Sequence, residues 1–423
     1  TSVNLKRYST ILIAIIMQKT FTVLSLIILN SAILFGQTWQ ERAEAPGIGR
    51  HHPVTFSLDG KGYMVAGTTD FTTATSDFYQ YDPANDSWAT LTDFPGVGRG
   101  FSISDTWDGK AYMGFGFGSN NDYLKDLWEF DPTTQTWTEL ASCPCAERIH
   151  PTFVIEDGLL FVGLGNNDVS GNLDDWWEYN ISTDTWRQLP DIPGPPRHHP
   201  FMFSANGDVY TGLGHGNSPG TNIYDDWYKW DIQNEEWEQM NDFPGEARVA
   251  GTQFSIGDRG FVLSGDGDNH YTMAEGEFWE YDYQTDTWEE LPPHPGVSRW
   301  APGSFVIDEV VYFMAGEIRT GNSGAGLQKD LWSFDLAAIA NTLSDNQFSE
   351  ITLYPNPARS LINLEGVTGS NTTIKIVNSA GITVLDQRLS NANIDVSRLQ
   401  GGLYFISIEQ GGIPSQRLKF TKL

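Results

Sequence analysis

The sequence predicts an all-β protein: a six-bladed β-propeller followed by a small C-terminal β-sandwich. The first observation is a unit of about 49 residues that occurs six times along residues 37–340. The second is the composition, because 13% aromatic residues and 43 glycines are typical of packed strands joined by tight turns. The third is that tryptophan is absent from residues 351–423, while short alternating strands continue there, which indicates a separate β-domain.

Each repeat contains the same landmarks at the same spacing. An anchor tryptophan is followed by a proline seven residues later, by an arginine four further on, and by a glycine 17 beyond that. Only the segment between this glycine and the next acidic residue varies in length, which predicts one variable loop per repeat. The tryptophans are Trp39, Trp88, Trp137, Trp186, Trp237 and Trp288, and the acids are Asp77, Asp126, Asp175, Asp226, Glu277 and Asp330.

Four short strands are expected in every repeat, described here for the unit that starts at Arg99. Strand a covers residues 101–104, strand b residues 112–116 and strand c residues 126–131, and strand d is centred on Trp137. Asp-Gly between strands a and b, and Asp-Pro between c and d, are typical turn residues. One such sheet cannot bury both of its faces alone, so radial stacking into a propeller is expected.

The two ends of the repeat array predict a ring that is closed by an N-terminal strand. Trp39 has no strands a to c before it, and the sixth repeat has Asn341 where the next anchor tryptophan would fall. The strand around Trp39 is therefore expected to complete the blade that begins at Arg299. This arrangement gives six blades over residues 37–340.

These features resemble the kelch-repeat family. The resemblance covers nearly all of residues 37–340 and rests on the glycine that ends strand b, the turn after strand c and the spaced tryptophan. It departs from the family in that the usual double glycine is mostly Ala-Gly, Phe-Gly or Leu-Gly here. The resemblance implies a propeller of the galactose oxidase-like superfamily, a fold that serves binding proteins and enzymes alike.

Residues 1–36 are expected to be a signal peptide with its upstream segment. A basic start at residues 17–19 precedes an apolar run over residues 21–35 and the small residue Gly36, which is the pattern of a secretory signal. An uncleaved membrane anchor is the alternative. We expect export without a permanent membrane span.

Residues 341–350 carry no repeat and are expected to be a linker, and residues 351–423 closely resemble the C-terminal sorting domain of the type IX secretion system, the Por secretion tail. The resemblance implies a Bacteroidetes-type bacterium, with export across the inner membrane by the signal peptide. It further implies that the type IX machinery recognises residues 351–423 and delivers the protein outside the cell or to the outer-membrane surface. The matching segments are Leu353–Ala358, Ile376–Gly381, Ile394–Leu399 and Gly401–Tyr404, with Lys419 and Lys422 near the end.

Net charge and cysteine content narrow the classes of function. A net charge of −29 argues against nucleic acid as a partner and is typical of an exported protein. Cys143 and Cys145 lie two apart in a segment expected to be extended, where disulfide geometry fits poorly. Two thiols alone are also too few for a zinc centre.

The arginines and the variable loops are expected on one face, because the d–a and b–c connections lie at the same end of each blade. A ring of guanidinium groups around the channel suits a carboxylate ligand, so the arginines are candidate ligand-binding residues. In the alternative, each arginine pairs with the acid that opens strand c and leaves nothing for a ligand. The six are Arg50, Arg99, Arg148, Arg197, Arg248 and Arg299.

Five of the eight histidines follow these arginines by one or two positions. Among them, His52, His150 and His199 are candidate ligand-binding residues, since such a cluster suits metal binding or acid–base chemistry. A strand position that recurs in a repeat also holds histidine for packing alone, so no catalytic residue, metal or cofactor is assigned. The loop at residues 265–269 is expected to be solvated rather than a calcium site.

The sequence therefore predicts a secreted or cell-surface kelch propeller that binds a glycan, peptide or protein on the arginine and long-loop face. The alternative is a carbohydrate-active enzyme, because the resemblance extends to sialic-acid mutarotases and to copper-dependent galactose oxidases. The tyrosine–cysteine crosslink of the oxidases is not expected, since both cysteines lie in one turn. A binding role is favoured because no catalytic residue can be matched.

Overall fold

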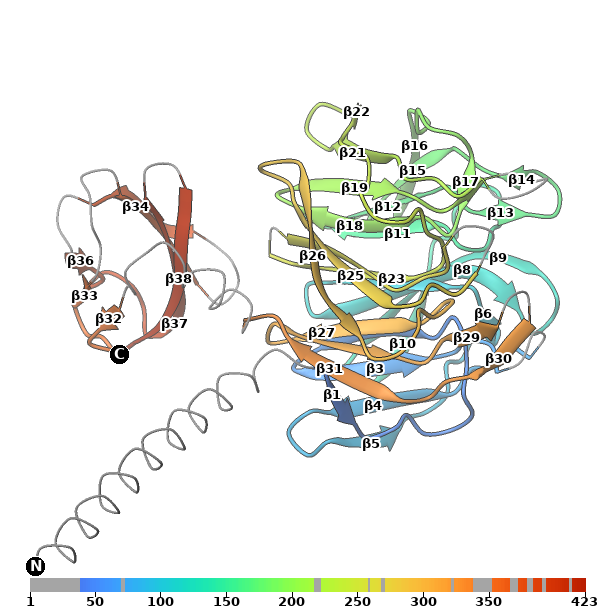
Figure 1. Ribbon diagram of the computed structural model, residues 1–423, viewed down its shortest axis with the longest axis horizontal. Helices are drawn as coiled ribbons and strands as arrows, with labels where there is room; N and C mark the ends of the chain where they lie inside the picture. The colour runs from blue at the N-terminus through green and yellow to red at the C-terminus, as the bar shows by residue number, and fades with distance from the viewer. Residues whose placement is uncertain are drawn as a thin grey trace, which may run out of the picture. The chain divides into compact units, whose positions relative to one another are not determined.

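The computed structural model describes residues 39–69, 73–216, 222–257, 259–267, 271–320, 323–337, 352–365, 372–378, 383–389, 393–410 and 413–423. Every named element within these ranges is a β-strand (Figure 1). No helix in them is both long enough and apolar enough to cross a membrane. The chain divides into two compact units, of which the first extends to Asp335 and the second begins at Leu336. The expected signal segment, residues 1–36, and the expected linker, residues 341–350, lie outside the described residues.

The first unit contains six antiparallel sheets, each built on four strands, which we call blades 1 to 6. Blade 1 contains β2 (Val54–Leu58), β3 (Lys61–Val65), β4 (Phe78–Asp82) and β5 (Ser87–Thr90); blade 2 contains β7 (Ile103–Trp107), β8 (Lys110–Gly118), β9 (Tyr123–Asp131) and β10 (Thr136–Leu140), with the short β6 (Arg99–Gly100) beside β8. Blade 3 contains β11 (Thr152–Glu156), β12 (Leu159–Gly163), β15 (Trp176–Asn180) and β16 (Thr185–Leu189); blade 4 contains β18 (Phe201–Ala205), β19 (Asp208–Gly212), β21 (Trp227–Asp231) and β22 (Glu236–Gln239). Blade 5 contains β23 (Thr252–Ile256), β24 (Arg259–Leu263), β25 (Gly276–Asp282) and β26 (Thr287–His294); blade 6 contains β27 (Gly303–Ile307), β28 (Val310–Met314), β31 (Leu331–Asp335) and β1 (Gln40–Arg42).

The blades form a closed ring. The first strand of each blade contacts the first strand of the next, and β27 of blade 6 returns to β2 of blade 1. β1 pairs antiparallel with β31, so that Gln40 lies opposite Ser333 and Arg42 opposite Leu331. The N-terminal strand thus supplies the outermost strand of the last blade, and one sheet joins the two ends of the ring (Figure 1).

Aromatic and aliphatic side chains fill the space between neighbouring blades. Between blades 1 and 2, for example, Phe56 and Val65 pack with Met113 and Phe130 in one buried cluster. A fully buried side chain of this size contributes about 1.5–3 kcal/mol of free energy to folding. Because each sheet has neighbours on both faces, this alternation of large side chains is what makes the ring stable.

Four of the six anchor tryptophans donate a hydrogen bond to the backbone of the neighbouring blade. The indole of Trp88 donates to the carbonyl of Ala43, and the amide of Ala43 donates to Asp86, at 2.9 Å in both cases. Trp186 and Asp184 make the same pair of bonds to Ala141. The indoles of Trp39 and Trp237 donate to the carbonyls of Pro292 and Pro190 in the neighbouring blades, whereas those of Trp137 and Trp288 have no hydrogen-bond partner among the described residues.

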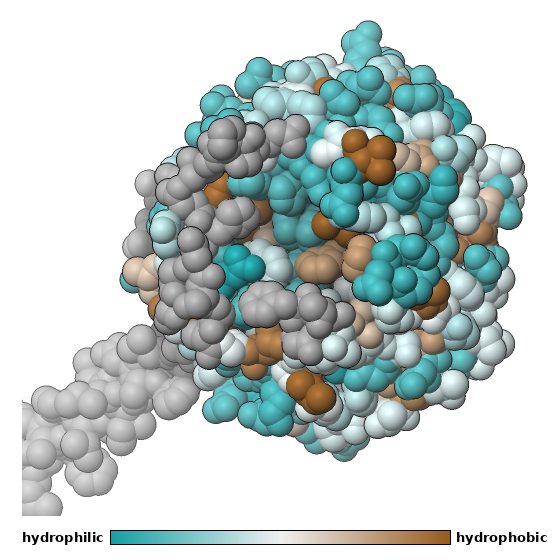
Figure 2. All heavy atoms as spheres, turned by 90° about the vertical axis from the view of Figure 1, so that its right-hand side faces the viewer, coloured by the Kyte–Doolittle hydropathy of each residue, from teal (hydrophilic) through white to brown (hydrophobic). Residues whose placement is uncertain are grey.

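Short hairpins extend the b–c connections on one face of the ring, which we call the loop face. They consist of β13 (Asn166–Asn167) with β14 (Gly171–Asn172) and β29 (Glu317–Thr320) with β30 (Ser323–Leu327). In blade 4, β20 (His215–Gly216) of the b–c connection pairs instead with β17 (Arg197–His198), which precedes strand a. Figure 2 looks onto this face, which is hollowed near its middle. The variable segments of the sequence therefore surround the end of the central channel.

The second unit contains two sheets that share one core. Their facing sides contribute Ile362 and Ile394 from the first sheet and Ile376, Ile406 and Phe420 from the second, all buried in one cluster. Two antiparallel sheets that pack around a common apolar layer form a β-sandwich. The first sheet contains β32 (Thr352–Tyr354), β33 (Leu361–Glu365) and β36 (Asn393–Asp395), and the second contains β35 (Thr383–Arg388), β34 (Thr372–Asn378), β37 (Gly402–Gln410) and β38 (Ile413–Lys422).

Candidate functional site: the channel end of the loop face

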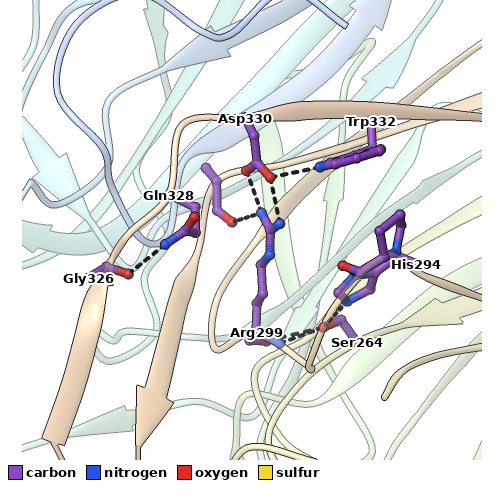
Figure 3. Close-up of polar contacts among 9 residues, drawn as sticks. Ser264, His294, Arg299, Gly326, Gln328, Asp330 and Trp332 are labelled. Atoms are coloured by element: carbon purple, nitrogen blue, oxygen red, sulfur yellow. Dashed lines mark hydrogen bonds and ion pairs between the residues drawn. The ribbon is translucent and has the colours of Figure 1, made fainter. Parts of the chain in front are cut away.

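The six repeat arginines are buried, and each pairs with the acid that opens strand c of its own blade. Arg99, which is 0% exposed, donates to both oxygens of Asp126 at 2.8 and 2.7 Å and to the carbonyl of Phe115. Figure 3 shows the same arrangement in blade 6, where Asp330 accepts from Arg299 and from the indole of Trp332. The pairs are Arg50–Asp77, Arg99–Asp126, Arg148–Asp175, Arg197–Asp226, Arg248–Glu277 and Arg299–Asp330.

This geometry corresponds to the pairing alternative of the two that the sequence leaves open. Burial by itself would raise the pKa of the Asp126 carboxyl, but the hydrogen bonds and charge of Arg99 outweigh it and lower that pKa. The pKa values of Asp77, Asp175 and Asp330 are lowered in the same way. Each guanidinium is thus committed to a charged partner within its blade.

The residue two positions after each arginine lies at the channel. These six positions have a left-handed backbone with φ between 49° and 57°, a conformation that is uncommon for residues other than glycine. Backbone bonds join them from blade to blade: His52 donates to the carbonyl of Ala301, Ala301 to that of Ala250, and His150 to that of Phe101. The set, which we call the channel ring, comprises His52, Phe101, His150, His199, Ala250 and Ala301, and it lines a cavity of about 120 Å³.

The channel ring brings the three predicted histidines together, from blades 1, 3 and 4. One nitrogen of each imidazole lies within 4.8 Å of those of the other two. Nε2 of His52 and Nε2 of His199 are 3.0 Å apart, and the rings of His150 and His199 are stacked. We call His52, His150 and His199 the histidine triad.

Burial favours the uncharged form of His52 and His150 in the histidine triad. It is the largest effect that lowers the pKa of His52 and of His150 well below the ordinary value, and repulsion from neighbouring histidines adds to it. Neutral imidazole carries one nitrogen with a lone pair, which is available to a proton or a metal ion. Both ring nitrogens of His150 are buried without a hydrogen-bond partner among the described residues.

Three charged residues and one tryptophan lie next to the triad. We call Asp266, Trp300, Glu317 and Arg319 the mouth cluster. The guanidinium of Arg319 lies 3.7 Å from the centre of the Trp300 ring, 3.5 Å from Asp266 and 3.2 Å from Glu317. The Trp300 ring in turn lies 4.6 Å from the ring of His52, measured between centroids. Burial raises the pKa of the Asp266 carboxyl to about 7, although the charge of Arg319 acts in the opposite direction.

Sequence reasoning missed the mouth cluster. Asp266 lies in the loop expected to be solvated, yet its side chain is 0% exposed, because its backbone pairs with Val249 and holds it against the channel. Glu317 pairs with Trp300 in the same way. Both residues directly follow the landmark glycine of their repeat, so the register would have located them if that position had been compared across all six repeats.

The structure corrects the expectation for the two cysteines, since Cys143 and Cys145 form a disulfide. The segment around Pro144 is a tight turn rather than an extended strand, and it brings the two Cα atoms to 5.1 Å, within the range that a disulfide spans. Both side chains are buried between blades 2 and 3, so the disulfide belongs to the core of the ring.

Comparisons with known proteins agree with this architecture. Residues 62–318 match the family model described as the Attractin/LZTR1 beta-propeller, and residues 352–421 match that of the secretion system C-terminal sorting domain. No curated protein matches the chain. A solved structure entitled "Structure of YjhT" is similar over 60% of this chain and 87% of its own, at 17% identity and a TM-score of 0.53, which is a likeness of fold.

Proposed function

Since the chain belongs to the Attractin/LZTR1 β-propeller family, we propose that it is a secreted kelch propeller that binds a neutral glycan at the channel end of its loop face. The sorting domain over residues 352–421 interacts with the type IX secretion machinery, which exports the protein to the cell surface or beyond it. The glycan is the proposed part. It would be recognised outside the cell by the mouth cluster and the hairpins around it.

The observation that carries this proposal is the mouth cluster itself. Asp266 and Glu317 are 0% and 3% exposed and Arg319 is 17% exposed, so their charges are held by one another. Trp300 connects them to His52, which lines the channel cavity. Carboxylates and a guanidinium in a fixed arrangement next to an indole suit the hydroxyl groups and the apolar face of a sugar ring. On blades 3 and 4, the pair formed by Asn172 and His198 adds further polar groups.

The charges of the chain favour a neutral ligand over an acidic one. A ring of free arginines was the reason to expect a carboxylate ligand, and each of these arginines has its own acidic partner. The net charge of −29 disfavours the approach of an acidic glycan to the remaining surface. A neutral oligosaccharide needs no unpaired arginine and is not repelled by the negative charge of the surface.

A glycan array probed with the full chain tests the proposal, with Arg319→Ala and Arg259→Ala compared side by side. Arg259 is a matched control, because it is also paired with an acid, Glu280, but lies in strand β24 beside the a–b turn, away from the channel end. We expect Arg319→Ala to lower the signal for neutral glycans at least about tenfold, the range in which loss of a charged hydrogen bond falls. Arg259→Ala should leave the signal unchanged.

Two results would contradict the proposal. One is an array on which the folded wild-type chain binds no neutral glycan. The other is a glycan signal that Arg319→Ala and Arg259→Ala reduce equally, because such a signal would arise elsewhere on the surface.

A carbohydrate-active enzyme is the second candidate, and the raised pKa of Asp266 favours it. A carboxyl whose pKa is about 7 can donate and accept a proton near neutral pH, which exchange of sugar anomers requires. NMR exchange spectroscopy on free reducing sugars, sialic acids included, would detect this activity. The candidate is rejected if the wild-type chain exchanges anomers no faster than its Asp266→Asn variant.

A further inference from the structure

We propose that the histidine triad binds a divalent transition-metal ion, Zn²⁺ in the first instance, at the end of the central channel. The three imidazoles come from three different blades and converge on one point, with a nitrogen of each within 4.8 Å of the others. Zinc–nitrogen bonds of about 2.0–2.1 Å in tetrahedral geometry separate ligand nitrogens by about 3.3 Å. Nε2 of His52 and Nε2 of His199, at 3.0 Å, are already close to that separation.

The backbone that carries the triad is fixed before any ion binds. Each histidine occupies the same left-handed position of the channel ring, and backbone hydrogen bonds connect this ring across blades, as from His52 to Ala301 and from His150 to Phe101. The preceding arginine of each blade is anchored by its acid. Ligands on such a rigid frame need little reorganisation to reach a metal, which favours tight binding.

The chemical state of the triad suits a metal ion. Three imidazoles in mutual contact would repel one another if protonated, and each neutral imidazole carries one ring nitrogen whose lone pair can bind a metal ion. Because the rings of His150 and His199 are stacked, their side chains would rotate to direct both lone pairs at one ion. The two ring nitrogens of His150 are buried without a hydrogen-bond partner among the described residues, which is costly for polar atoms. A metal ion would satisfy one of them.

A neighbouring histidine would orient one of the ligands. Nδ1 of His51 lies 2.7 Å from Nδ1 of His52, on the side of the ring that faces away from His199. When Nδ1 of His52 donates to Nδ1 of His51, Nε2 of His52 keeps its lone pair for the metal, in the manner of outer partners that set the tautomer of metal-binding histidines. His51 itself is 1% exposed and packs against Trp300.

The other half of the channel ring leaves room beside the ion. Ala250 and Ala301 occupy the equivalent positions of blades 5 and 6, and the cavity there measures about 120 Å³. Three protein nitrogens with an adjacent space are the arrangement of metal sites that keep one coordination position open to water or to a small ligand. The site is thus expected to accept an exogenous ligand as well as the ion.

Metal binding is tested on the full chain without a polyhistidine tag, after treatment with a chelator, by titration with Zn²⁺ in a calorimeter and with Co²⁺ in a spectrophotometer. The variant is His150→Phe, because Phe101 shows that this ring position accepts phenylalanine with the same backbone. We expect one high-affinity Zn²⁺ per wild-type chain and visible absorption bands of four-coordinate Co²⁺. In His150→Phe the affinity should fall more than the 10–100-fold that loss of an outer partner costs.

His198→Ala is the control. His198 directly precedes His199 and its ring packs beside that of His199, but it does not belong to the triad. This variant should keep one high-affinity ion and the Co²⁺ spectrum. The proposal is overturned if the wild-type chain binds no Zn²⁺ at one equivalent, or if folded His150→Phe, judged by an unchanged circular dichroism spectrum, binds as tightly as wild type. Arg319→Ala should retain the ion, so failure of the glycan proposal and failure of this one are separable.

Discussion

At the scale of single residues, the repeat arginine has a structural role, although its charge suggests a ligand-binding one. Arg99 is 0% exposed, bonds to Asp126 through both terminal nitrogens, and donates to the carbonyl that precedes the landmark glycine. It therefore ties the start of strand a to strands b and c of the same blade. Six such ties keep the channel ring in position, which is why the arginine recurs without exception in the repeats.

Removal of one partner of this pair should destabilise the propeller strongly. Asp126→Ala leaves the buried guanidinium of Arg99 without a countercharge, and such changes cost about 3–5 kcal/mol of the free energy of unfolding. Glu44→Ala is the matched control, because Glu44 and Lys329 form a pair that is about half exposed on both sides and should contribute at most about 1 kcal/mol. Urea denaturation of both variants measures the difference. Equal losses of unfolding free energy in the two variants would show that burial of the Arg99–Asp126 pair does not increase its contribution to stability.

His294 makes the stability of the fold depend on pH between about 6.5 and 3. Burial, followed by the charge of Arg299, lowers the pKa of His294 from 6.5 to about 3, and its Nε2 lies 2.9 Å from the hydroxyl of Ser264 (Figure 3). Below pH 6.5 the unfolded chain takes up a proton that the folded chain does not. This group thus destabilises the fold by up to about 1.4 kcal/mol per pH unit as the pH falls from about 6.5 towards 3.

Denaturation of wild type and His294→Asn at several pH values between 7 and 4 checks this expectation. The loss of stability on acidification should be smaller in His294→Asn, whose side chain takes up no proton in either state. Parallel pH profiles would contradict it.

The departure from the usual double glycine also has an explanation at this scale. The first residue of each pair, such as Phe115, adopts φ of 60° with a side chain that is buried, so packing offsets the cost of the left-handed backbone. The second residue remains glycine for steric reasons. At Gly116, φ is 101° and a Cβ atom would lie 2.5 Å from the carbonyl oxygen of Gly100.

At the scale of elements, the three-residue strand β1 has an effect out of proportion to its length. It pairs with β31, and the preceding Trp39 packs against Phe278 of blade 5 and Phe313 and Phe334 of blade 6. The strand therefore completes one blade, and its tryptophan fills the space between that blade and its neighbour.

Trp39→Ala should loosen the ring at this joint. Loss of a tryptophan between two blades costs about 3–5 kcal/mol, and hydrogen exchange is expected to quicken first in β31 and β28, which depend on β1, while β12 of blade 3 stays protected. Exchange monitored by mass spectrometry distinguishes the two regions. Uniform acceleration in all six blades would show that the ring opens as a single unit.

The elements were predictable from the sequence to different degrees. The blades follow from landmarks inside one repeat, such as Trp137 and the Asp131–Pro132 turn, since these act over a few residues. The short distances between His52, His150 and His199 were not predictable, because they depend on the closed ring that brings three blades to one axis. Arg319 was missed because it lies in a loop whose length differs between repeats, and Cys143 because Pro144 bends a segment expected to be straight.

At the scale of the whole molecule, two separate cores predict two independent folding units. The propeller and the sandwich have their own apolar clusters, and the sandwich core consists only of residues from Ala358 onward. The second unit matches a domain whose role is export. The proposed binding surface and the export signal therefore lie in different units of the chain.

A chain that stops before residue 352 should still form the propeller but should no longer be exported across the outer membrane. Its thermal unfolding transition is expected to coincide with that of the propeller in the full chain, because no residue of the propeller core is removed. In cells with the secretion system, the shortened protein should accumulate inside the outer membrane. Fractionation with an antibody to the propeller measures this, and normal appearance outside the cell would contradict the assignment.

The pairing of β1 with β31 also determines which step of folding comes last. The guanidinium of Arg42 and the hydroxyl of Ser333, which meet across the β1–β31 pair, are 291 positions apart in the sequence. A contact of such long range closes late, since nearly the whole propeller must emerge from the ribosome or a translocon before its last blade can find its missing strand. Until then the outer edge of β31 has no partner strand, and an unpaired edge of this kind can pair with other chains.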